Sequence, residues 1–133
     1  MKFLKFKKRF LRHALGAPFI FSVIIPFVIM DLWVEMYHRI CFKLYKIPYV
    51  ERSRYLKFDR HHLKYLTFFQ KIYCLYCSYG NGLVNYWVKI AGETEIYWCG
   101  IKHHQDRNFI QPEHQKNFAE YGNEQDFIDK YKS

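Results

Sequence analysis

The chain has 133 residues, which is enough for one small domain with an appended segment at either end. Half of its residues are apolar and 21% are aromatic, so it can bury a core or face an interface at which one end of each ring is wet. The sequence contains no phosphate-cradling glycine loop, no nucleophile elbow and no Ser-centred triad. These absences exclude the enzyme classes that such motifs define.

The whole chain has a net charge of +9, and its positive charge is concentrated in the N-terminal half. Residues 1–64 hold fourteen Lys and Arg against four acids, whereas residues 106–133 hold four against six. The basic half also contains the longest apolar run, which favours attraction to the anionic headgroups of a membrane surface. Nucleic acid is the alternative partner for a basic chain. We expect lipid as the partner, and a larger membrane complex as a second one.

Residues 1–13 predict a basic amphipathic helix. Phe3, Phe6 and Phe10 recur at helical spacing, with Lys and Arg between them. Such a helix is suited to lie in the headgroup layer of a membrane. The alternative is a helix that docks on its own domain.

An uncharged apolar run of seventeen residues follows, from Ala14 to Met30. As a helix it is about 25 Å long at ~1.5 Å per residue, which is shorter than the ~30 Å hydrocarbon core of a bilayer. Lys and Arg flank it on both sides, whereas a spanning helix normally has its positive charge on one side. Both ends stay cytoplasmic if the segment dips in and out around Pro26. A tilted single span and a buried core helix are the alternatives.

The remaining elements are predicted from periodicity, caps and breakers. The helical pattern after the apolar run should end before Pro48, because the residue that precedes a proline is pushed out of helical geometry. Asp59 is the expected N-cap of the next helix, which Gly80-Asn81-Gly82 should break. A second helix is expected from Leu83, ended or kinked at Gly92.

These elements predict a mostly α fold. An N-terminal amphipathic, re-entrant or membrane-spanning helix is expected first, followed by a small helical hairpin domain with a Cys/His cluster. Three segments follow from composition and charge: a basic membrane-anchoring helical segment over residues 1–47, a helical Cys/His domain over 48–105 and a polar acidic tail over 106–133. The tail is expected to be loosely held, with a short helix around residues 118–131.

Cysteine spacing is the most informative feature of the chain. Cys74-x2-Cys77 is followed after twenty-one residues by Cys99-x3-His103. Four soft ligands are the number that a tetrahedral zinc or a small iron–sulfur centre needs. No cleavage site follows the apolar run, and in a reducing compartment clustered cysteines are more often metal ligands than disulfides. Cys74, Cys77, Cys99 and His103 are therefore the predicted metal ligands, provided that the chain breaks at Gly92 and folds back.

Two other interpretations of these residues stay open. Cys74 and Cys77 can form a redox-active dithiol, or all the thiols can be inert groups on a helical hairpin with an exposed His. His104 is a weaker alternative to His103 as a ligand. Cys41 is expected to be a free buried thiol.

A second constellation combines carboxylates with imidazoles. Glu35-x2-His38 and Asp59-x2-His62 each place an acid and a histidine one helical turn apart, and Asp31 lies one turn before Glu35. Dinuclear iron proteins use such pairs from two helices, together with a Glu from each of two more. The alternative is a set of hydrogen-bonded polar groups at the boundary between lipid and water.

Residues 59–103 resemble a family of small uncharacterised bacterial proteins. The resemblance lies in Cys74-Leu75-Tyr76-Cys77-Ser78-Tyr79-Gly80-Asn81-Gly82 and in Tyr97-Trp98-Cys99-Gly100-Ile101-Lys102-His103. The family has a Cys-x-Tyr-Cys-x-Tyr-x-Asn-Gly box and a Tyr-Trp-Cys-Pro-Ile-Lys-His box. This chain departs from the second box at Gly100, where the family has proline. The resemblance implies a bacterial origin and brings no activity or cofactor with it.

Together these features predict a membrane-associated, small metal-binding protein on the cytoplasmic face of a bacterial inner membrane. Zinc in a structural role is the favoured cofactor, because it stabilises a small domain outright. Iron, or an iron–sulfur centre, is the alternative. A membrane-surface oxidoreductase that uses such a centre or the dithiol is the second functional hypothesis. A metal-free adaptor subunit of a membrane complex is the third.

Overall fold

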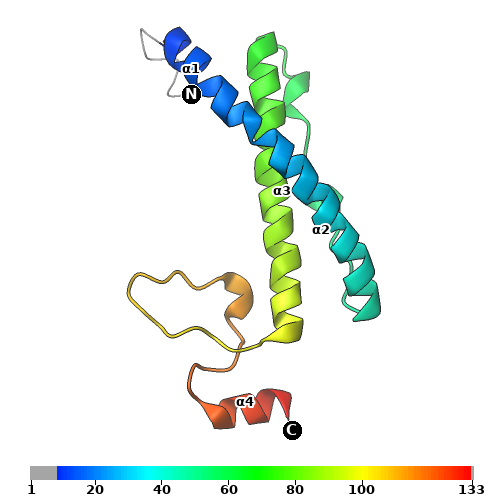
Figure 1. Ribbon diagram of the computed structural model, residues 1–133, viewed down its shortest axis with the longest axis vertical. Helices are drawn as coiled ribbons and strands as arrows, with labels where there is room; N and C mark the ends of the chain where they lie inside the picture. Colours follow the sequence, from blue (N-terminus) through cyan, green and yellow to red (C-terminus); the bar gives the residue numbers. More distant parts are fainter. Residues whose placement is uncertain (1–8, 133) are drawn as a thin grey trace. The chain divides into compact units, whose positions relative to one another are not determined.

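The computed structural model describes residues 9–132, and in this range the chain is mostly helical, as predicted. Its α-helices are α1 (Arg9–Ser22), α2 (Ile24–Leu44), α3 (Phe68–Trp98) and α4 (Glu124–Tyr131), shown in Figure 1. Short 3₁₀ turns occupy Arg52–Arg54 (η2), Arg60–His62 (η3) and Glu113–Gln115 (η4). An isolated parallel bridge between Ile101 and Ala119 is the only β pairing within the described range.

α1 and α2 follow one another in the same direction, separated by Val23 alone (Figure 1). The range Phe10–Leu44 is the one helix among the described residues that is long and apolar enough to cross a membrane. Pro26 lies in the first turn of α2, where the backbone N–H groups have no intrahelical partner to lose. The prediction of a re-entrant segment that enters and leaves the membrane around Pro26 was therefore wrong, since the chain does not reverse there.

The chain forms two compact units, Met1–Asn85 (unit 1) and Tyr86–Ser133 (unit 2), and α3 contributes its first half to unit 1 and its second half to unit 2. This division differs from the segments 1–47, 48–105 and 106–133. Those segments followed changes in composition and charge along the sequence. The compact units follow contacts between residues that are distant in sequence.

In unit 1 the α1–α2 pair crosses the first half of α3. The Phe21 ring lies 5.4 Å from the Tyr73 ring and 5.0 Å from the Tyr76 ring, measured between centroids. Further along both helices, the Tyr79 hydroxyl donates a hydrogen bond to Asp31. Residue numbers rise together on the two sides, so the helices run in the same direction. Residues 45–67, which we call the crossover, must therefore return along the helices before α3 begins.

α3 is unbroken over 31 residues, so the break at Gly80-Asn81-Gly82 and the end or kink at Gly92 were wrong. Because neither break is present, one long helix takes the place of the expected helical hairpin. The two glycines near residue 81 serve close packing. A Cβ at Gly82 would lie 2.6 Å from the Tyr55 carbonyl oxygen, and a Cβ at Gly80 would lie 3.3 Å from the Phe27 ring. Glycine is the residue that lets another segment approach a helix backbone this closely.

The start of α3 is defined by a reciprocal capping pair. The Thr67 N–H donates to Gln70 Oε1 at 2.9 Å, and the Gln70 N–H donates to Thr67 Oγ1 at 3.4 Å. This is the capping-box arrangement, which satisfies two backbone donors at a helix N-terminus. Asp59 instead precedes η3 and makes no side-chain cap bond. Its assignment as the N-cap of this helix was therefore wrong.

In unit 2 the segment after α3 packs on the end of that helix. Tyr86 and Ile90 of α3 are buried, as are Phe118 and Ala119. The Ala119 N–H donates to the Gly100 carbonyl oxygen, and the Ala119 carbonyl oxygen accepts from the Lys102 N–H. The C-terminal residues are thus held more firmly than their composition indicates.

The helix expected around residues 118–131 is present as α4, although it is shorter. It begins at Glu124 because the Asn123 side chain caps it by accepting a hydrogen bond from the Asp126 N–H.

Gly82→Ala is expected to lower the free energy of unfolding, whereas Gly16→Ala in α1 is expected to raise it. Alanine contributes up to about 1 kcal/mol of helix propensity at either position. At Gly82 overpacking against the Tyr55 carbonyl costs about 1–3 kcal/mol and outweighs that gain. At Gly16 nothing lies within 4 Å of the added carbon, so the gain is retained. Urea unfolding in mild detergent measures both effects, and a Gly82→Ala variant as stable as Gly16→Ala would contradict the close approach.

Candidate functional site

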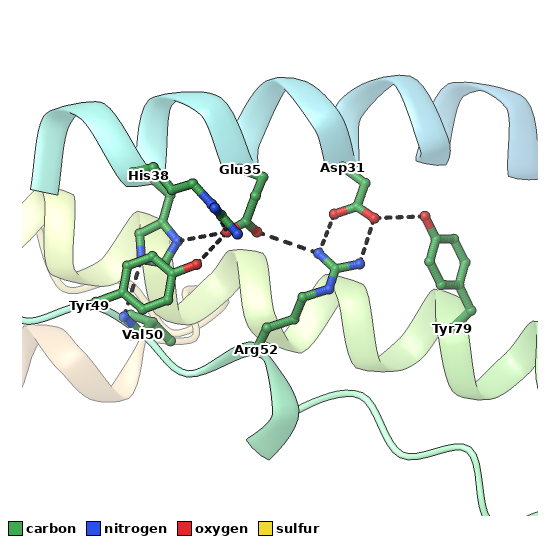
Figure 2. Close-up of polar contacts among 8 residues, drawn as sticks. Asp31, Glu35, His38, Tyr49, Val50, Arg52 and Tyr79 are labelled. Carbon is green, nitrogen blue, oxygen red and sulfur yellow. Dashed lines mark hydrogen bonds and ion pairs between the residues drawn. The ribbon is translucent and has the colours of Figure 1, made fainter.

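A polar cluster follows the apolar run on α2. Asp31, Glu35 and His38 lie at positions i, i+4 and i+7, which places them on one face of the helix. Figure 2 shows all three directed toward the crossover and α3. We use the name polar cluster for these three residues together with their partners Arg39, Tyr49, Arg52 and Tyr79.

Asp31 and Arg52 form the centre of this cluster. The Arg52 guanidinium donates from Nη1 to Asp31 Oδ1 at 2.5 Å and from Nη2 to Asp31 Oδ2 at 2.6 Å. Such bidentate, charge-assisted pairs are among the strongest side-chain hydrogen bonds. The Tyr79 hydroxyl adds a third bond, to Asp31 Oδ2 at 2.9 Å (Figure 2). Asp31 thereby connects α2, the crossover and α3 within unit 1.

Glu35 is held by three donors. The Tyr49 hydroxyl donates to Glu35 Oε1 at 2.5 Å, and Arg39 Nε donates to the same oxygen at 3.3 Å. Arg52 Nη1 lies 3.5 Å from the other oxygen. Two carboxylates therefore face two guanidinium groups, and the charges of these four groups cancel. A balanced set costs less to hold near an apolar environment than an excess of either sign.

His38 is fully buried, and its hydrogen bond determines which ring nitrogen carries the proton. Nε2 accepts the Val50 N–H at 3.1 Å, so this nitrogen is unprotonated and the ring is neutral. The proton is then on Nδ1, which lies 3.7 Å from Glu35 Oε1. The ring stacks on Tyr49 at 4.1 Å and contacts the Phe42 ring edge-on. With its lone pair engaged by Val50, this imidazole serves as a packed hydrogen-bond acceptor.

Of the two interpretations of the carboxylate–imidazole pattern, the hydrogen-bonded one matches the observed contacts of Asp31, Glu35 and His38. The second predicted pair lies elsewhere, with Asp59 before η3 and the His62 ring 3.9 Å from the ring of His61. Arg52, Tyr49 and Tyr79 were missed by sequence reasoning. The one signal available was the acidic face of α2, where two carboxylates have Arg39 as their one basic neighbour on the same face, so that further donors from another segment were required.

The structure places the four predicted metal ligands as follows. Cys74 is buried and Cys77 is exposed, both on α3, while Cys99 follows the end of α3 and is exposed. The exposed His103 ring lies 5.4 Å from the Phe109 ring. Convergence of the four residues required a break at Gly92, where α3 continues.

Throughout residues 9–132, no group of three or more His, Cys, Asp or Glu side chains is placed where it could hold a metal ion. A zinc or iron centre at Cys74, Cys77, Cys99 and His103 therefore stays a prediction from spacing. All four cysteines are free thiols, and the one outside this set, Cys41, is half-buried on α2.

Unit 2 contains a smaller polar group, formed by Glu95, His114 and Gln115, that explains the glycine at position 92. His114 Nε2 lies 2.5 Å from Glu95 Oε2, and Gln115 donates to Glu95 Oε1 at 2.8 Å. The His114 hydrogen bond holds the pKa of Glu95 below its ordinary value. A Cβ at Gly92 would lie 3.0 Å from the His114 ring. Gly92 therefore makes room for this ring on α3.

Comparisons with protein-family models, with curated protein sequences and with solved structures found no match to this chain. The resemblance in the two cysteine boxes thus stays a resemblance.

Replacing Arg52 by Gln or Asp31 by Asn is expected to lower the free energy of unfolding by about 1–3 kcal/mol, because each change leaves a partly buried charge without its partner. The double variant should lose less than the sum of the two, with a coupling of at least about 1 kcal/mol.

Arg54→Gln is the matched control. Arg54 pairs with Glu51 at 3.3 Å, but both side chains are mostly exposed, so the loss should stay within about 0.5 kcal/mol. Urea unfolding of the four variants measures these values. Additive losses for Asp31 and Arg52 would show that the bidentate pair does not hold unit 1 together.

Proposed function

We propose that this protein is a membrane-anchored adaptor, with α1–α2 embedded lengthwise in the cytoplasmic leaflet of a bacterial inner membrane and the rest of the chain binding a larger membrane complex. One observation carries the anchor. In the most apolar eighteen-residue window of Phe10–Leu44, none of the residues is buried. The apolar core helix of a soluble protein buries such a window.

The apolar surface of the anchor is large. Leu32 is 71% exposed, Phe19 78% and Ile25 65%. Sixteen large apolar side chains between residues 10 and 44 are exposed in all. Each Å² of such surface removed from water is favourable by about 25 cal/mol, so contact with lipid tails would stabilise the chain substantially. A surface of this kind on a small protein marks a membrane or protein interface.

The direction of the helices favours a lengthwise over a crossing orientation. Because α2 and α3 run in the same direction, the crossover returns along the helices from Leu44 to Phe68. It carries six Lys and Arg and two acids. In a crossing orientation those charges and the largely non-helical backbone of the crossover would enter the hydrocarbon, which is costly. In a lengthwise orientation the crossover can remain among headgroups and water.

Charge supports the same orientation. Residues 1–64 carry a net charge of +10, and Lys and Arg flank the apolar run on both sides. Each basic residue near an anionic leaflet contributes about 1 kcal/mol of attraction. Two basic flanks fit an arrangement in which both ends of the anchor lie on the cytoplasmic side. The bacterial assignment comes from the resemblance in the cysteine boxes.

The contacts of the polar cluster support a structural role for its residues. Both of its carboxylates accept hydrogen bonds from Arg and Tyr side chains, and the His38 acceptor nitrogen is engaged by Val50. Because the lone pairs of these groups already accept hydrogen bonds, the groups hold segments together and are poorly available for proton transfer or for binding a metal. The cluster therefore supports a positioning role for unit 1.

A metal centre is the second candidate function, and the observation that favours it is the spacing of Cys74, Cys77, Cys99 and His103. If these donors bind zinc or iron, protein purified without a chelating tag should contain one metal ion per chain by elemental analysis. Visible absorption would indicate iron, and a colourless protein zinc. Cys77→Ser should lose the metal, whereas Cys41→Ser should retain it. Wild-type protein free of metal would contradict this candidate.

Ile25→Asp is expected to weaken membrane binding, because a charge on the lipid-facing side of the anchor costs up to about 3 kcal/mol in the bilayer. Ile110→Asp is the matched control, since Ile110 is 89% exposed in unit 2 and lies outside the anchor. Co-sedimentation with vesicles that contain phosphatidylglycerol measures both. Equal sedimentation of Ile25→Asp and wild type would argue against the anchor.

A further inference from the structure

A second feature of unit 1 is a polar pocket between the crossover and α3. Its volume is about 360 Å³, and it is open to solvent. This is within the range of ~300–1,000 Å³ typical of small-molecule sites. The crossover contributes Lys57, Asp59 and Arg60 to its lining, and α3 contributes Ser78, Asn81 and Asn85.

The pocket depends on the close approach at Gly82. The Tyr55 carbonyl oxygen would be 2.6 Å from a Cβ at this position, and the Leu56 Cα would be 3.2 Å from it. Gly82 and Tyr55 both line the pocket, so this contact forms part of its wall. The side chains of the crossover are thereby set opposite those of α3.

The charges of the pocket favour an anion. Lys57 and Arg60 are exposed, and neither forms an ion pair in the part of the chain that the structure describes. Ser78 and Asn85 add neutral hydrogen-bonding groups from α3. A guanidinium and an ammonium beside neutral donors match a phosphoryl group, which offers several acceptor oxygens around one centre.

Asp59 limits which phosphoryl compound fits. It is the one acid in the lining, so the charged groups of the pocket sum to +1. A carboxylate here repels phosphoryl oxygens, and it can accept a hydrogen bond from a hydroxyl group on the ester substituent. A phosphate ester with a small hydroxylated substituent satisfies the cations and Asp59 together.

We propose that this pocket binds the phosphoryl group of a small phosphate ester, either as a phospholipid headgroup or as a soluble molecule. The site goes beyond the adaptor function, since its residues lie in the crossover and α3 and do not depend on insertion of α1–α2 into lipid. Lys57 and Arg60 bind the phosphoryl oxygens, Asn85 adds a hydrogen bond, and Asp59 accepts from the ester substituent.

The test uses the full chain in micelles of a neutral detergent, with binding measured by isothermal titration calorimetry. Three probes are titrated separately: inorganic phosphate, glycerol 3-phosphate and short-chain phosphatidylglycerol. The pocket variant carries Lys57→Gln and Arg60→Gln. The control carries Arg54→Gln and Lys64→Gln, which remove the same charge from the crossover outside the pocket. Asn85→Leu is a second pocket variant that leaves the charge unchanged.

The wild-type protein should bind at least one phosphate ester, and the pocket variant should bind it at least about tenfold more weakly. Asn85→Leu should also weaken binding, while the control should stay within about threefold of the wild type. The ester that binds more tightly identifies the source as lipid or soluble. Equal weakening in pocket and control variants, binding of inorganic phosphate alone or no binding of any probe would overturn the proposal. Sedimentation with vesicles reads out the anchor separately, so the two proposals fail independently.

Discussion

The bidentate pair between Asp31 and Arg52 is the interaction on which unit 1 depends. α2 and α3 run in the same direction, so no short turn can join them, and a 23-residue crossover must be fixed in place instead. Ordering a segment of this length costs conformational entropy that a few specific contacts have to offset. Arg52 and the Val50 N–H provide these contacts from the crossover, to Asp31 and His38 of α2. Tyr79 joins α3 to the same Asp31 carboxylate. These contacts hold the crossover, with its Lys and Arg side chains, along one side of the α1–α2 helix pair.

The balance of charge in the polar cluster connects this packing to the membrane proposal. Asp31 and Glu35 are neutralised by Arg52 and Arg39, so the cluster adds no net charge beside an apolar helix. The remaining surface of α1–α2 is left apolar and exposed. The α1–α2 helix pair is thus apolar on its exposed side and polar on the side where the crossover packs against it. It then has the two-sided character of an interfacial anchor.

The sequence predicted the apolar helix, its end before Pro48 and the acidic face of α2, because these features depend on local periodicity. It did not predict the path of α3, since glycine is typical both of turns and of close helix packing, and only the proximity of Tyr55 and Phe27 decides between them. The start of α3 was predicted at the wrong residue, because Asp59 and Thr67 are both typical N-caps and only Thr67 has its reciprocal partner, Gln70, three residues later. Arg52 pairs with an acid 21 residues away, which no local pattern specifies. The cysteine spacing is compatible with a metal centre, but the break at Gly92 on which that prediction depended is absent from α3.

The most direct test of the lengthwise anchor is the side of the membrane on which each end of the chain lies. Reporter enzymes that are active on only one side of the inner membrane are fused to residue 1 and to residue 133 in separate strains. Both fusions should report the cytoplasmic side while the protein remains in the membrane fraction, because an in-plane helix leaves its two flanks on the same side. Opposite sides for the two ends would show that α1–α2 crosses the bilayer and would contradict the account.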